Sequence, residues 1–471
     1  MEKLIGRDKE QGMLQKCLAS GKPEFVLVYG RRRIGKTFLI RSFFKEQFAF
    51  SYTGGHGLNE KRQLESFALA LQKQANSPFS LTLKDWYDAF RQLQCLLEVM
   101  PSRKRKVVFI DEMPWMAPPK SEFLKAFENF WNGWGSHQNE LLFIACGSAT
   151  SWMTEHILDN QGGLHNRITR SIYLPPFSLH DVEAYLQSRN MNWDRYQIMQ
   201  AYMILGGVPY YYSLLDSSLS LVQNVDALFF AKGGQLKNEY SELYAALFNK
   251  PEPYLSVVEA LAAKPNGMSR QSIADKTGIS GSTLTKILGN LEKCDFITSI
   301  SFYGNTVKNA LYRLSDFYSL FHLKFIANNK SKDTAFWSHI INTPMLNSWQ
   351  GYSFELICIL HLDAMKKALG ISGILTQASV WHNEYAQIDL LIERADRMIN
   401  VCEMKFSVDK YTITKDYEAK LRTKLEAFRN ATNCRKGLLL TLVTTYGLQP
   451  GKNNSIVQTE ITLDDLFSSA N

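Results

Sequence analysis

Residues 25–44 read FVLVYGRRRIGKTFLIRSFF, and this stretch decides the fold. Its first five residues are apolar and predict a buried strand, whereas the residues from Phe38 onward are compatible with a helix. Between the two lies the spacing G-x-x-x-x-G-K-T, from Gly30 to Thr37. Strand, glycine-containing loop and helix in this order are typical of a phosphate-binding loop in a parallel α/β sheet.

The chemistry of this loop suits a nucleoside triphosphate. Gly30 and Gly35 let backbone N–H groups turn toward an anion, since no Cβ stands in the way, and the helix N-terminus adds partial positive charge. Lys36 is expected to bridge the β- and γ-phosphates, and the Thr37 hydroxyl to hold Mg²⁺. We therefore predict ATP and Mg²⁺ as cofactors. The other predicted nucleotide-binding residues of the loop are Arg31, Arg32, Arg33, Ile34 and Phe38.

The composition is that of a multidomain globular protein. A chain of 471 residues is too long for one hydrophobic core, so more than one domain is expected. Its seven cysteines are dispersed and form no C-x-x-C, which indicates a reducing compartment and neither a disulfide framework nor a zinc site. No apolar run approaches the roughly 20 residues of a membrane span, and the charged start of the chain is unlike a signal peptide. We expect a cytoplasmic protein with no membrane partner. Its net charge of +8 permits nucleic-acid binding without requiring it.

A second nucleotide signature lies further along the chain. The apolar run 107–110 predicts a strand buried on both faces of a parallel sheet, and it ends in Asp111 and Glu112. Acids at this end of a strand lie at the edge where ligands of open α/β sheets bind. Asp111 is expected to hold Mg²⁺ through water, and Glu112 to orient and deprotonate the attacking water.

Two further residues are expected near the γ-phosphate. The run 141–146 predicts the next strand, and Ser148 follows it within Gly147-Ser148-Ala149, where it should lie beside Asp111. Arg167 is a candidate for the charge that stabilises the transition state, supplied in cis or from a neighbouring subunit. If a neighbouring subunit supplies Arg167, the protein is a homo-oligomer. Alternatively, Arg167 is an ordinary surface arginine.

Together these motifs resemble the AAA-type ATPases first described from archaea, within the STAND group. The resemblance covers residues 1–250 and rests on five stretches: Gly6-Arg7, the loop 30–37, Asp111-Glu112, Gly147-Ser148-Ala149 and Leu205-Gly206-Gly207-Val208-Pro209-Tyr210.

The resemblance also implies contacts to the nucleotide base. STAND relatives carry Gly-x-Pro in a helical lid, with the proline near the base, and Gly207 and Pro209 match that pattern. The same resemblance puts Ile5, Gly6 and Arg7 beside the adenine. No lid arginine for the γ-phosphate is recognisable, which puts fast turnover in doubt.

The pattern changes at Pro251-Glu252-Pro253. Three helical segments and two strand-like runs around Tyr303-Gly304-Asn305 then predict a winged helix. DNA binding by the segment 283–293 is one interpretation. The other is a protein-interaction or spacer module, and it is slightly favoured because only Lys286 and Lys293 are basic in that segment.

The C-terminal part carries a second candidate site. Glu403 and Lys405 lie two residues apart on a predicted strand and therefore face the same way. Asp389 lies on the predicted partner strand, and Glu355 on a preceding helix. These residues, with a helix–strand–strand order followed by helix and strand, resemble the PD-(D/E)XK nuclease core.

The resemblance implies roles for these four residues. The carboxylates of Glu355, Asp389 and Glu403 would bind Mg²⁺, and Lys405 would position water or stabilise the developing charge. Two alternatives stay open: an exposed hairpin with Glu–Lys pairs, and an inactive nuclease-like fold that serves as a binding platform.

We therefore predict an α/β protein with a P-loop AAA+ parallel sheet, a helical lid, a winged helix and a C-terminal restriction-endonuclease-like α/β domain. The expected function is an ATP-hydrolysing switch coupled to a metal-dependent DNA-cleaving or DNA-binding domain, with ATP, ADP and DNA as partners. The alternatives are a non-catalytic, ATP-regulated DNA-binding or scaffold protein, and ATP-driven protein remodelling by a hexamer. The expected domains are residues 1–175 (ATPase core), 176–250 (lid), 251–316 (winged helix), 317–345 (linker) and 346–471 (nuclease-like).

Overall fold

A computed structural model describes residues 4–101, 105–148, 150–158, 162–164, 166–248, 250–304 and 310–469. The chain divides into two compact units, Met1–Pro176 and Phe177–Asn471. Ala149 and Asn305, which belong to two of the motifs above, lie outside the described residues. Within the part that the structure describes, no helix is long and apolar enough to cross a membrane.

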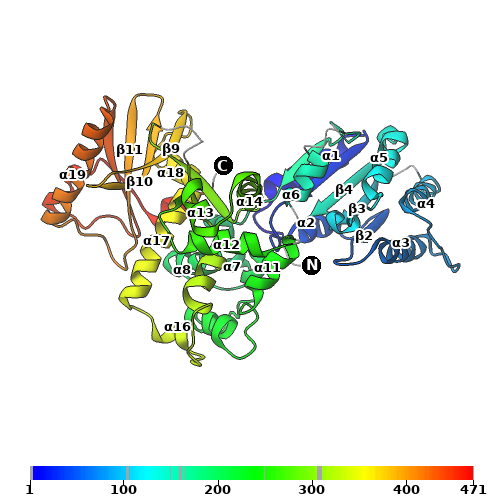
Figure 1. The fold of residues 1–471 in the computed structure, drawn as a ribbon, viewed down its shortest axis with the longest axis horizontal. Helices are drawn as coiled ribbons and strands as arrows, with labels where there is room; N and C mark the ends of the chain where they lie inside the picture. The colour runs from blue at the N-terminus through cyan, green and yellow to red at the C-terminus, as the bar shows by residue number, and fades with distance from the viewer. Residues whose placement is uncertain are drawn as a thin grey trace. The chain divides into compact units, whose positions relative to one another are not determined.

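The first unit is built on a five-stranded, wholly parallel sheet with the order β2-β3-β4-β1-β5. Figure 1 labels β2, β3 and β4 of this sheet. Because all strands run the same way, the residues that follow β1, β3 and β4 meet at one edge of the sheet. The strands are β1 (Glu24–Tyr29), β2 (Phe50–Thr53), β3 (Lys106–Asp111), β4 (Leu141–Gly147) and β5 (Arg170–Tyr173).

Helices cover both faces of this sheet, which explains why its strands are apolar throughout. In β1, Phe25 and Leu27 join a core with helices α3, α4 and α5, whereas Val26 and Val28 join a second core with α1 and α2. The elements are α1 (Asp8–Ala19), α2 (Lys36–Phe44), α3 (Glu60–Ala75), α4 (Trp86–Glu98), η1 (Met113–Met116), α5 (Phe123–Gly133), η2 (Gly135–His137), α6 (Thr150–Met153) and η3 (Thr154–Leu158).

The second unit begins with a helical segment whose buried tyrosines and leucines lie in one large core. Its elements are α7 (Leu179–Ser188), α8 (Arg195–Leu205), α9 (Pro209–Ser213), α10 (Leu221–Val225), η4 (Asp226–Phe230) and α11 (Glu239–Leu247). The predicted winged-helix segment follows as α12 (Glu252–Ala262), β6 (Met268–Ser269), α13 (Arg270–Thr277), α14 (Gly281–Lys293), β7 (Ile297–Phe302) and β8 (Leu311–Leu314).

The remaining elements connect this segment to the C-terminal region and complete it. Three short helical elements come first: α15 (Phe317–Phe321), η6 (His322–Ile326) and α16 (Phe336–His339). The C-terminal region comprises α17 (Pro344–Leu360), α18 (Leu362–Ala368), β9 (Thr376–His382), β10 (Gln387–Arg394), β11 (Met398–Lys405), α19 (Lys415–Thr432), β12 (Gly437–Thr444), η7 (Lys452–Ile456), β13 (Thr459–Ile461) and α20 (Leu463–Leu466).

One eight-stranded sheet joins the winged-helix segment to the C-terminal region. Its order is β13-β12-β11-β10-β9-β7-β8-β6. The junction is a parallel pairing of β7 with β9, in which Ser301 is opposite Ser379 and Phe302 opposite Val380. The two segments were predicted as separate domains, and in the structure this pairing joins their strands into one sheet.

In the C-terminal region, helices pack on both faces of the sheet (Figure 1). Cys402 and Met404 of β11 lie in the core that includes α17, whereas Ile399 and Val401 pack with Leu421 and other residues of α19. A β-bulge occurs in β10 relative to β9, between Ile388 and Leu391, so that Asp389 lies at an irregularity of the strand.

Candidate functional site

The backbone of the P-loop requires both of its glycines. Gly30 has φ +142°, and a Cβ there would lie 2.4 Å from the carbonyl oxygen of Leu174. Gly35 has φ +86° and is the N-cap of α2. A residue with a side chain would be strained at either position, so the loop conformation follows directly from the sequence.

Lys36 is buried and bound within this loop. Its Nζ donates to the carbonyl oxygens of Gly30 at 3.0 Å and of Arg31 at 2.7 Å. The side chain is 5% exposed. The ammonium charge therefore lies inside the loop that the sequence assigns to phosphate.

The residues predicted to bind Mg²⁺ are brought together across 74 positions of sequence. Thr37 Oγ1 donates to Asp111 Oδ2 at 2.8 Å, and Asp111 Oδ1 accepts from the backbone N–H of Glu112 at 3.0 Å. A hydroxyl and a carboxylate at the end of β3 are oxygen donors of the kind that Mg²⁺ prefers. The residues present therefore fit this cation.

Ser148 contacts Glu112. Its Oγ donates to Glu112 Oε1 at 2.6 Å, and its backbone N–H donates to Glu112 Oε2 at 3.1 Å. Glu112 itself has φ +47°, which is uncommon for a residue with a side chain. Ser148 was predicted to lie beside Asp111, but its hydrogen-bond partner is the neighbouring Glu112, and the two contacts orient that carboxylate.

The N-terminal segment also contacts the loop. Arg7 is 5% exposed, and its Nη2 donates to the carbonyl oxygen of Ile34 at 3.2 Å. Ile5 and Gly6 directly precede it. In contrast, Arg167 is exposed, and its role as a transition-state charge stays a prediction.

Gly207 and Pro209 have local structural roles in the second unit. The carbonyl of Gly207 accepts from Phe177 N at 2.7 Å, and a Cβ at Gly207 would lie 2.1 Å from the Phe177 carbonyl oxygen. Pro209 occupies the first turn of α9, where a missing N–H costs nothing. Their predicted contact with the nucleotide base stays a prediction.

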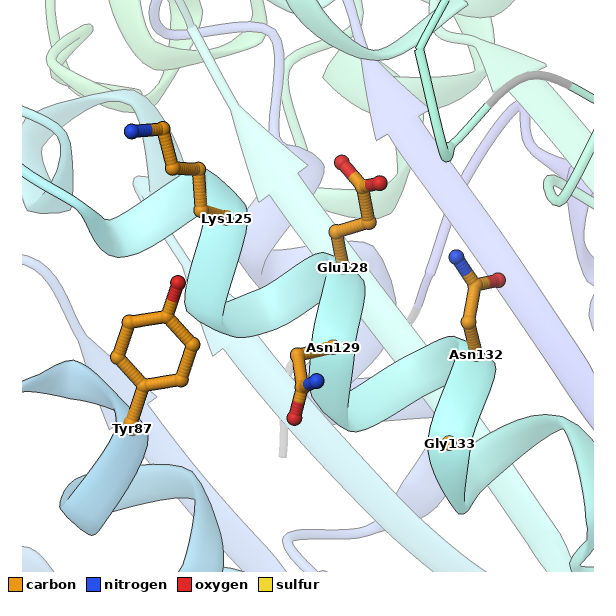
Figure 2. A pocket seen from close by; sticks show the side chains of 6 residues that line it. All are labelled: Tyr87, Lys125, Glu128, Asn129, Asn132 and Gly133. Atoms are coloured by element: carbon orange, nitrogen blue, oxygen red, sulfur yellow. The ribbon is translucent and has the colours of Figure 1, made fainter.

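A polar hollow on the first unit does not coincide with the predicted site. It has a volume of about 380 Å³ and lies between α4 and α5. Figure 2 shows Lys125, Glu128 and Asn132 along α5, with Tyr87 of α4 beside them. Asn132 Nδ2 donates to the carbonyl oxygen of Gly163 at 2.9 Å, so at least one of these polar groups serves to hold a neighbouring loop.

The parallel sheet, the glycine loop and the Thr37–Asp111 pair define a P-loop nucleotide-binding domain. Comparison with known families agrees: residues 4–215 match the family described as an ATPase domain predominantly from Archaea, so this region is similar to that ATPase domain. Residues 254–300 match the IclR helix-turn-helix domain, which supports the winged-helix prediction.

Relatives and solved structures are similar over longer stretches. "Uncharacterized protein MJECL04" of Methanocaldococcus jannaschii is 24% identical over 391 residues, covering 82% of this chain and 83% of that protein. The Walker-type ATPase PABY2304 of Pyrococcus abyssi is 20% identical, with a TM-score of 0.49, and covers 68% of this chain and 96% of that one. The ORC2 protein of Aeropyrum pernix, in ADPNP and ADP complexes, is 16% identical with a TM-score of 0.43, covering 68% and 93%.

At the second candidate site, the structure brings Glu403 and Lys405 together. Glu403 is 5% exposed. Its Oε1 accepts from Lys405 Nζ at 3.0 Å and from the Tyr417 hydroxyl at 2.8 Å, and its Oε2 accepts from Lys424 Nζ at 2.7 Å. Burial alone would raise the pKa of Glu403, but Lys405 and Lys424 outweigh it and lower that pKa.

Sequence reasoning missed Tyr417 and Lys424. Both lie on α19, seven residues apart and therefore on one face of the helix. The helix was predicted, and the seven-residue spacing places Tyr417 and Lys424 on one face of it. The sequence did not indicate that this face would pack against β11.

The other two acids lie nearby without joining this cluster. Asp389 is 9% exposed and accepts from Gln387 Nε2 at 2.6 Å. Burial and the charges of Asp389 and Glu403 raise the pKa of Glu355 to about 8, while Lys405 and Arg313 oppose that rise. Among the described residues, no group of three or more histidine, cysteine or acidic side chains is placed to hold a metal ion. The predicted metal set of Glu355, Asp389 and Glu403 is therefore not assembled.

Glu355→Gln is expected to weaken the pH dependence of stability. Because the folded-state pKa of Glu355 is raised from 4.5 to about 8, the stability linked to its proton is present below pH 4.5 and is lost as pH rises through 8. Glutamine cannot ionise, so the variant should unfold at least about 3 °C higher than the native chain at pH 9, the shift expected for ~1 kcal/mol in a unit of this size. At pH 5 the difference should be smaller.

Thermal unfolding of both chains at pH 5 and pH 9, followed by circular dichroism, checks this. Glu384→Gln, at an exposed position in the turn before β10, is the control and should leave the pH dependence unchanged. Equal pH dependence in Glu355→Gln and the native chain would contradict the prediction.

Proposed function

We propose that this protein is an ATP-binding and ATP-hydrolysing switch that controls a C-terminal domain acting on DNA. The main support for ATP binding and hydrolysis is the hydrogen bond between Thr37 and Asp111 at the end of β3. Next to this pair, Ser148 orients the Glu112 carboxylate. The match of residues 4–215 to an ATPase domain family supports it.

The residues of the loop have distinct tasks in this proposal. Gly30 and Gly35 give the backbone the conformation that surrounds phosphate, and Lys36 supplies a positive charge to it. When bound at Thr37 and Asp111, Mg²⁺ would neutralise charge on the phosphate oxygens. Glu112 accepts a proton from the attacking water, and Ser148 holds the Glu112 carboxylate in the orientation for that transfer.

Ser148→Ala is expected to lower kcat for ATP hydrolysis about tenfold while leaving KM within about twofold, because a misoriented base loses part of the general-base contribution. The hydroxyl contact of 2.6 Å disappears, whereas the backbone contact of 3.1 Å stays. Steady-state phosphate release measures both constants. Ser20→Ala, at the end of α1, is the matched control. An unchanged kcat would show that Ser148 does not position Glu112.

The second half of the proposal is that the C-terminal domain cleaves DNA in a state set by the ATPase. Three observations support it: the order of helices and strands from α17 to β12, the Glu403–Lys405 pair at 3.0 Å, and the charges of Asp389 and Glu403 acting on Glu355. The helix-turn-helix match at residues 254–300 supports DNA as the partner.

The second candidate function is an ATP-regulated DNA-binding or scaffold protein without nuclease activity. The closed network around Glu403 favours it, because Lys405, Lys424 and Tyr417 already satisfy that carboxylate. The absence of an assembled metal group among the described residues agrees with it.

One experiment separates the two functions. The purified chain is incubated with plasmid, linear and single-stranded DNA, with Mg²⁺ or Mn²⁺, each with and without ATP. Strand scission supports the nuclease function. Salt-dependent DNA affinity without scission under any condition supports the binding function, and neither scission nor affinity would overturn both.

A further inference from the structure

Gln63 is a completely buried glutamine whose side-chain amide is fully hydrogen-bonded. It lies on α3 and is 0% exposed. Its Oε1 accepts from the Tyr52 hydroxyl at 3.0 Å and from the backbone N–H of Gly55 at 3.0 Å. Its Nε2 donates to the carbonyl oxygens of Gly55 at 2.7 Å and of Trp115 at 2.8 Å. An amide has two donors and two acceptor positions, so the fold uses all of them.

These hydrogen bonds join two loops that follow neighbouring strands of the parallel sheet. Gly55 lies in the loop after β2, and Trp115 lies in η1, which follows β3. Because β2 and β3 pair in parallel up to their last residues, both loops leave the sheet at the same edge. Glu112, the predicted general base, lies at that edge between β3 and η1. Gln63 therefore connects the two loops beside this acid.

Trp115 links Gln63 to the backbone of Glu112. The Trp115 N–H donates to the carbonyl oxygen of Glu112 at 3.0 Å, while the Trp115 carbonyl accepts from Gln63. Glu112 is the N-cap of η1 and has φ +47°. A residue with a side chain keeps a positive φ only where its surroundings hold it there. The hydrogen bond from Gln63 holds the turn that contains this residue.

The loop after β2 also packs directly on the backbone of Glu112. The Gly54 N–H donates to the carbonyl oxygen of Asp111 at 2.9 Å. A Cβ at Gly54 would lie 2.7 Å from the carbonyl oxygen of Glu112, closer than a real Cβ approaches another atom. The loop therefore takes this position because a glycine stands at the contact. Gln63 binds the N–H and the carbonyl of the next residue, Gly55, and so keeps the loop in place.

We propose that Gln63 is a positioning residue for ATP hydrolysis, which holds the backbone of Glu112 so that its carboxylate stays aligned with the attacking water. Ser148 orients the carboxylate at its oxygens, and Gln63 holds the turn from which the side chain extends. A general base works only within hydrogen-bond reach of the proton that it accepts, so a small displacement of its backbone lowers the rate. The inference rests on the proposed function in one respect, that Glu112 is the base. It adds a residue of α3 that acts through Glu112.

The test measures ATP hydrolysis by phosphate release, and ATP affinity by isothermal titration, in the full native chain and in Gln63→Met. Methionine has nearly the size and shape of glutamine but cannot replace its hydrogen bonds to the two loops. Gln72→Met is the matched control. Gln72 lies on the same helix, and its Nε2 donates to the carbonyl oxygen of Phe79, in the loop between α3 and α4, at 2.6 Å. Thermal unfolding checks that each chain is folded at the assay temperature.

Gln63→Met is expected to lower kcat about tenfold while KM and the ATP affinity stay within about twofold of the native values, because the base is displaced and the P-loop is not. Gln72→Met should match the native chain in all three quantities. If Gln63→Met does not fold, Gly54→Ala replaces it. Its added Cβ presses on the carbonyl of Glu112, so the same loss of kcat at unchanged KM is expected.

A second measurement separates positioning from a merely structural role. Gln63→Met, or Gly54→Ala in its place, is combined with Glu112→Gln, which removes the proton acceptor, and the residual turnover is measured with radiolabelled ATP and protein in excess. The added substitution should change this residual rate less than about twofold, because residues that act through one group lose their separate effects when that group is gone. A structural defect would slow both backgrounds equally.

The outcomes separate this inference from the proposed function. A native kcat in Gln63→Met, together with slow turnover in Glu112→Gln, would overturn the inference alone. A tenfold loss that persists in the Glu112→Gln background would also overturn it, because Gln63 would then not act through Glu112. Native turnover in Glu112→Gln would overturn the assignment of the base and the inference with it. Failure of the native chain to hydrolyse ATP would overturn both the inference and the proposed ATPase function.

Discussion

Lys36→Ala is expected to lower the affinity for ATP at least about 100-fold, which corresponds to about 2.8 kcal/mol. The Lys36 ammonium is buried inside the P-loop, where the carbonyls of Gly30 and Arg31 hold it at 3.0 and 2.7 Å. Alanine removes the one lysine charge from the loop 30–37, whose backbone is predicted to surround phosphate. Charge-assisted hydrogen bonds to phosphate are about twice as strong as neutral ones, so the loss should be large.

Isothermal titration of ATP into the two chains measures this effect. Lys45→Ala is the control, because Lys45 is exposed at the end of the same helix, and its affinity should match that of the native chain. Native affinity in Lys36→Ala would show that nucleotide binds elsewhere.

Glu112→Gln should separate binding from hydrolysis at the same site. Glutamine keeps the shape of the side chain and an oxygen that can accept from Ser148, but it cannot take a proton from water. ATP affinity should stay within about threefold while turnover falls at least about 100-fold. A variant that still hydrolyses ATP at the native rate would show that Glu112 is not the base.

Asp389→Ala, Glu403→Ala and Lys405→Ala are each expected to abolish DNA strand scission, with a loss of at least about 1000-fold, if the C-terminal domain is a nuclease. Asp389 and Glu403 are the two buried acids of the site, and Lys405 is bound to Glu403 at 3.0 Å. In-line attack on a phosphodiester needs an activated water and neutralised phosphoryl oxygens, and these side chains are the groups available for both.

Glu393→Ala is the matched control for this series. Glu393 lies on the same strand as Asp389, near its other end, and pairs with Lys436. Gel assays of plasmid nicking measure scission, and thermal unfolding checks that each variant is folded. Glu403→Ala needs this check most, because it leaves Lys405 and Lys424 without their shared partner. Native scission rates in all three variants would end the nuclease proposal.

The Glu112→Gln background distinguishes a gated nuclease from a binding platform. A gated enzyme should gain scission when ATP stays bound, because the ATPase would hold it in its active state. A platform should gain only DNA affinity. The double variant Glu112→Gln/Asp389→Ala identifies which activity has been gained. It should lose any gained scission, because Asp389 belongs to the predicted nuclease site, whereas a gain of DNA affinity alone should persist.

The sequence by itself determined the nucleotide site. Gly30, Gly35, Lys36 and Thr37 are adjacent in the chain, and their spacing constrains the backbone so tightly that the loop conformation could be predicted. Asp111, Glu112 and Ser148 could be predicted as well, because they follow buried parallel strands whose ends meet at one edge. The match of residues 4–215 to an ATPase domain family agrees with the predicted ATPase class, while the roles of these residues stay predictions. Ser148 contacts Glu112 in place of its expected neighbour Asp111, and Glu112 has a positive φ that the sequence did not predict.

The second site was decided by tertiary structure. The sequence supplied Asp389, Glu403 and Lys405 from the hairpin pattern, but Lys424 and Tyr417 reach Glu403 only because one face of α19 packs on β11. The β7–β9 pairing joins two predicted domains in one sheet, and Asn266 of the first donates to Gln387 of the second. Local propensity and motif spacing fix the conformation of neighbouring residues, whereas contacts between distant segments depend on how whole faces of helices and sheet edges pack. The conformation of the nucleotide loop therefore follows from the sequence, whereas tertiary packing decides which residues come together at the C-terminal site.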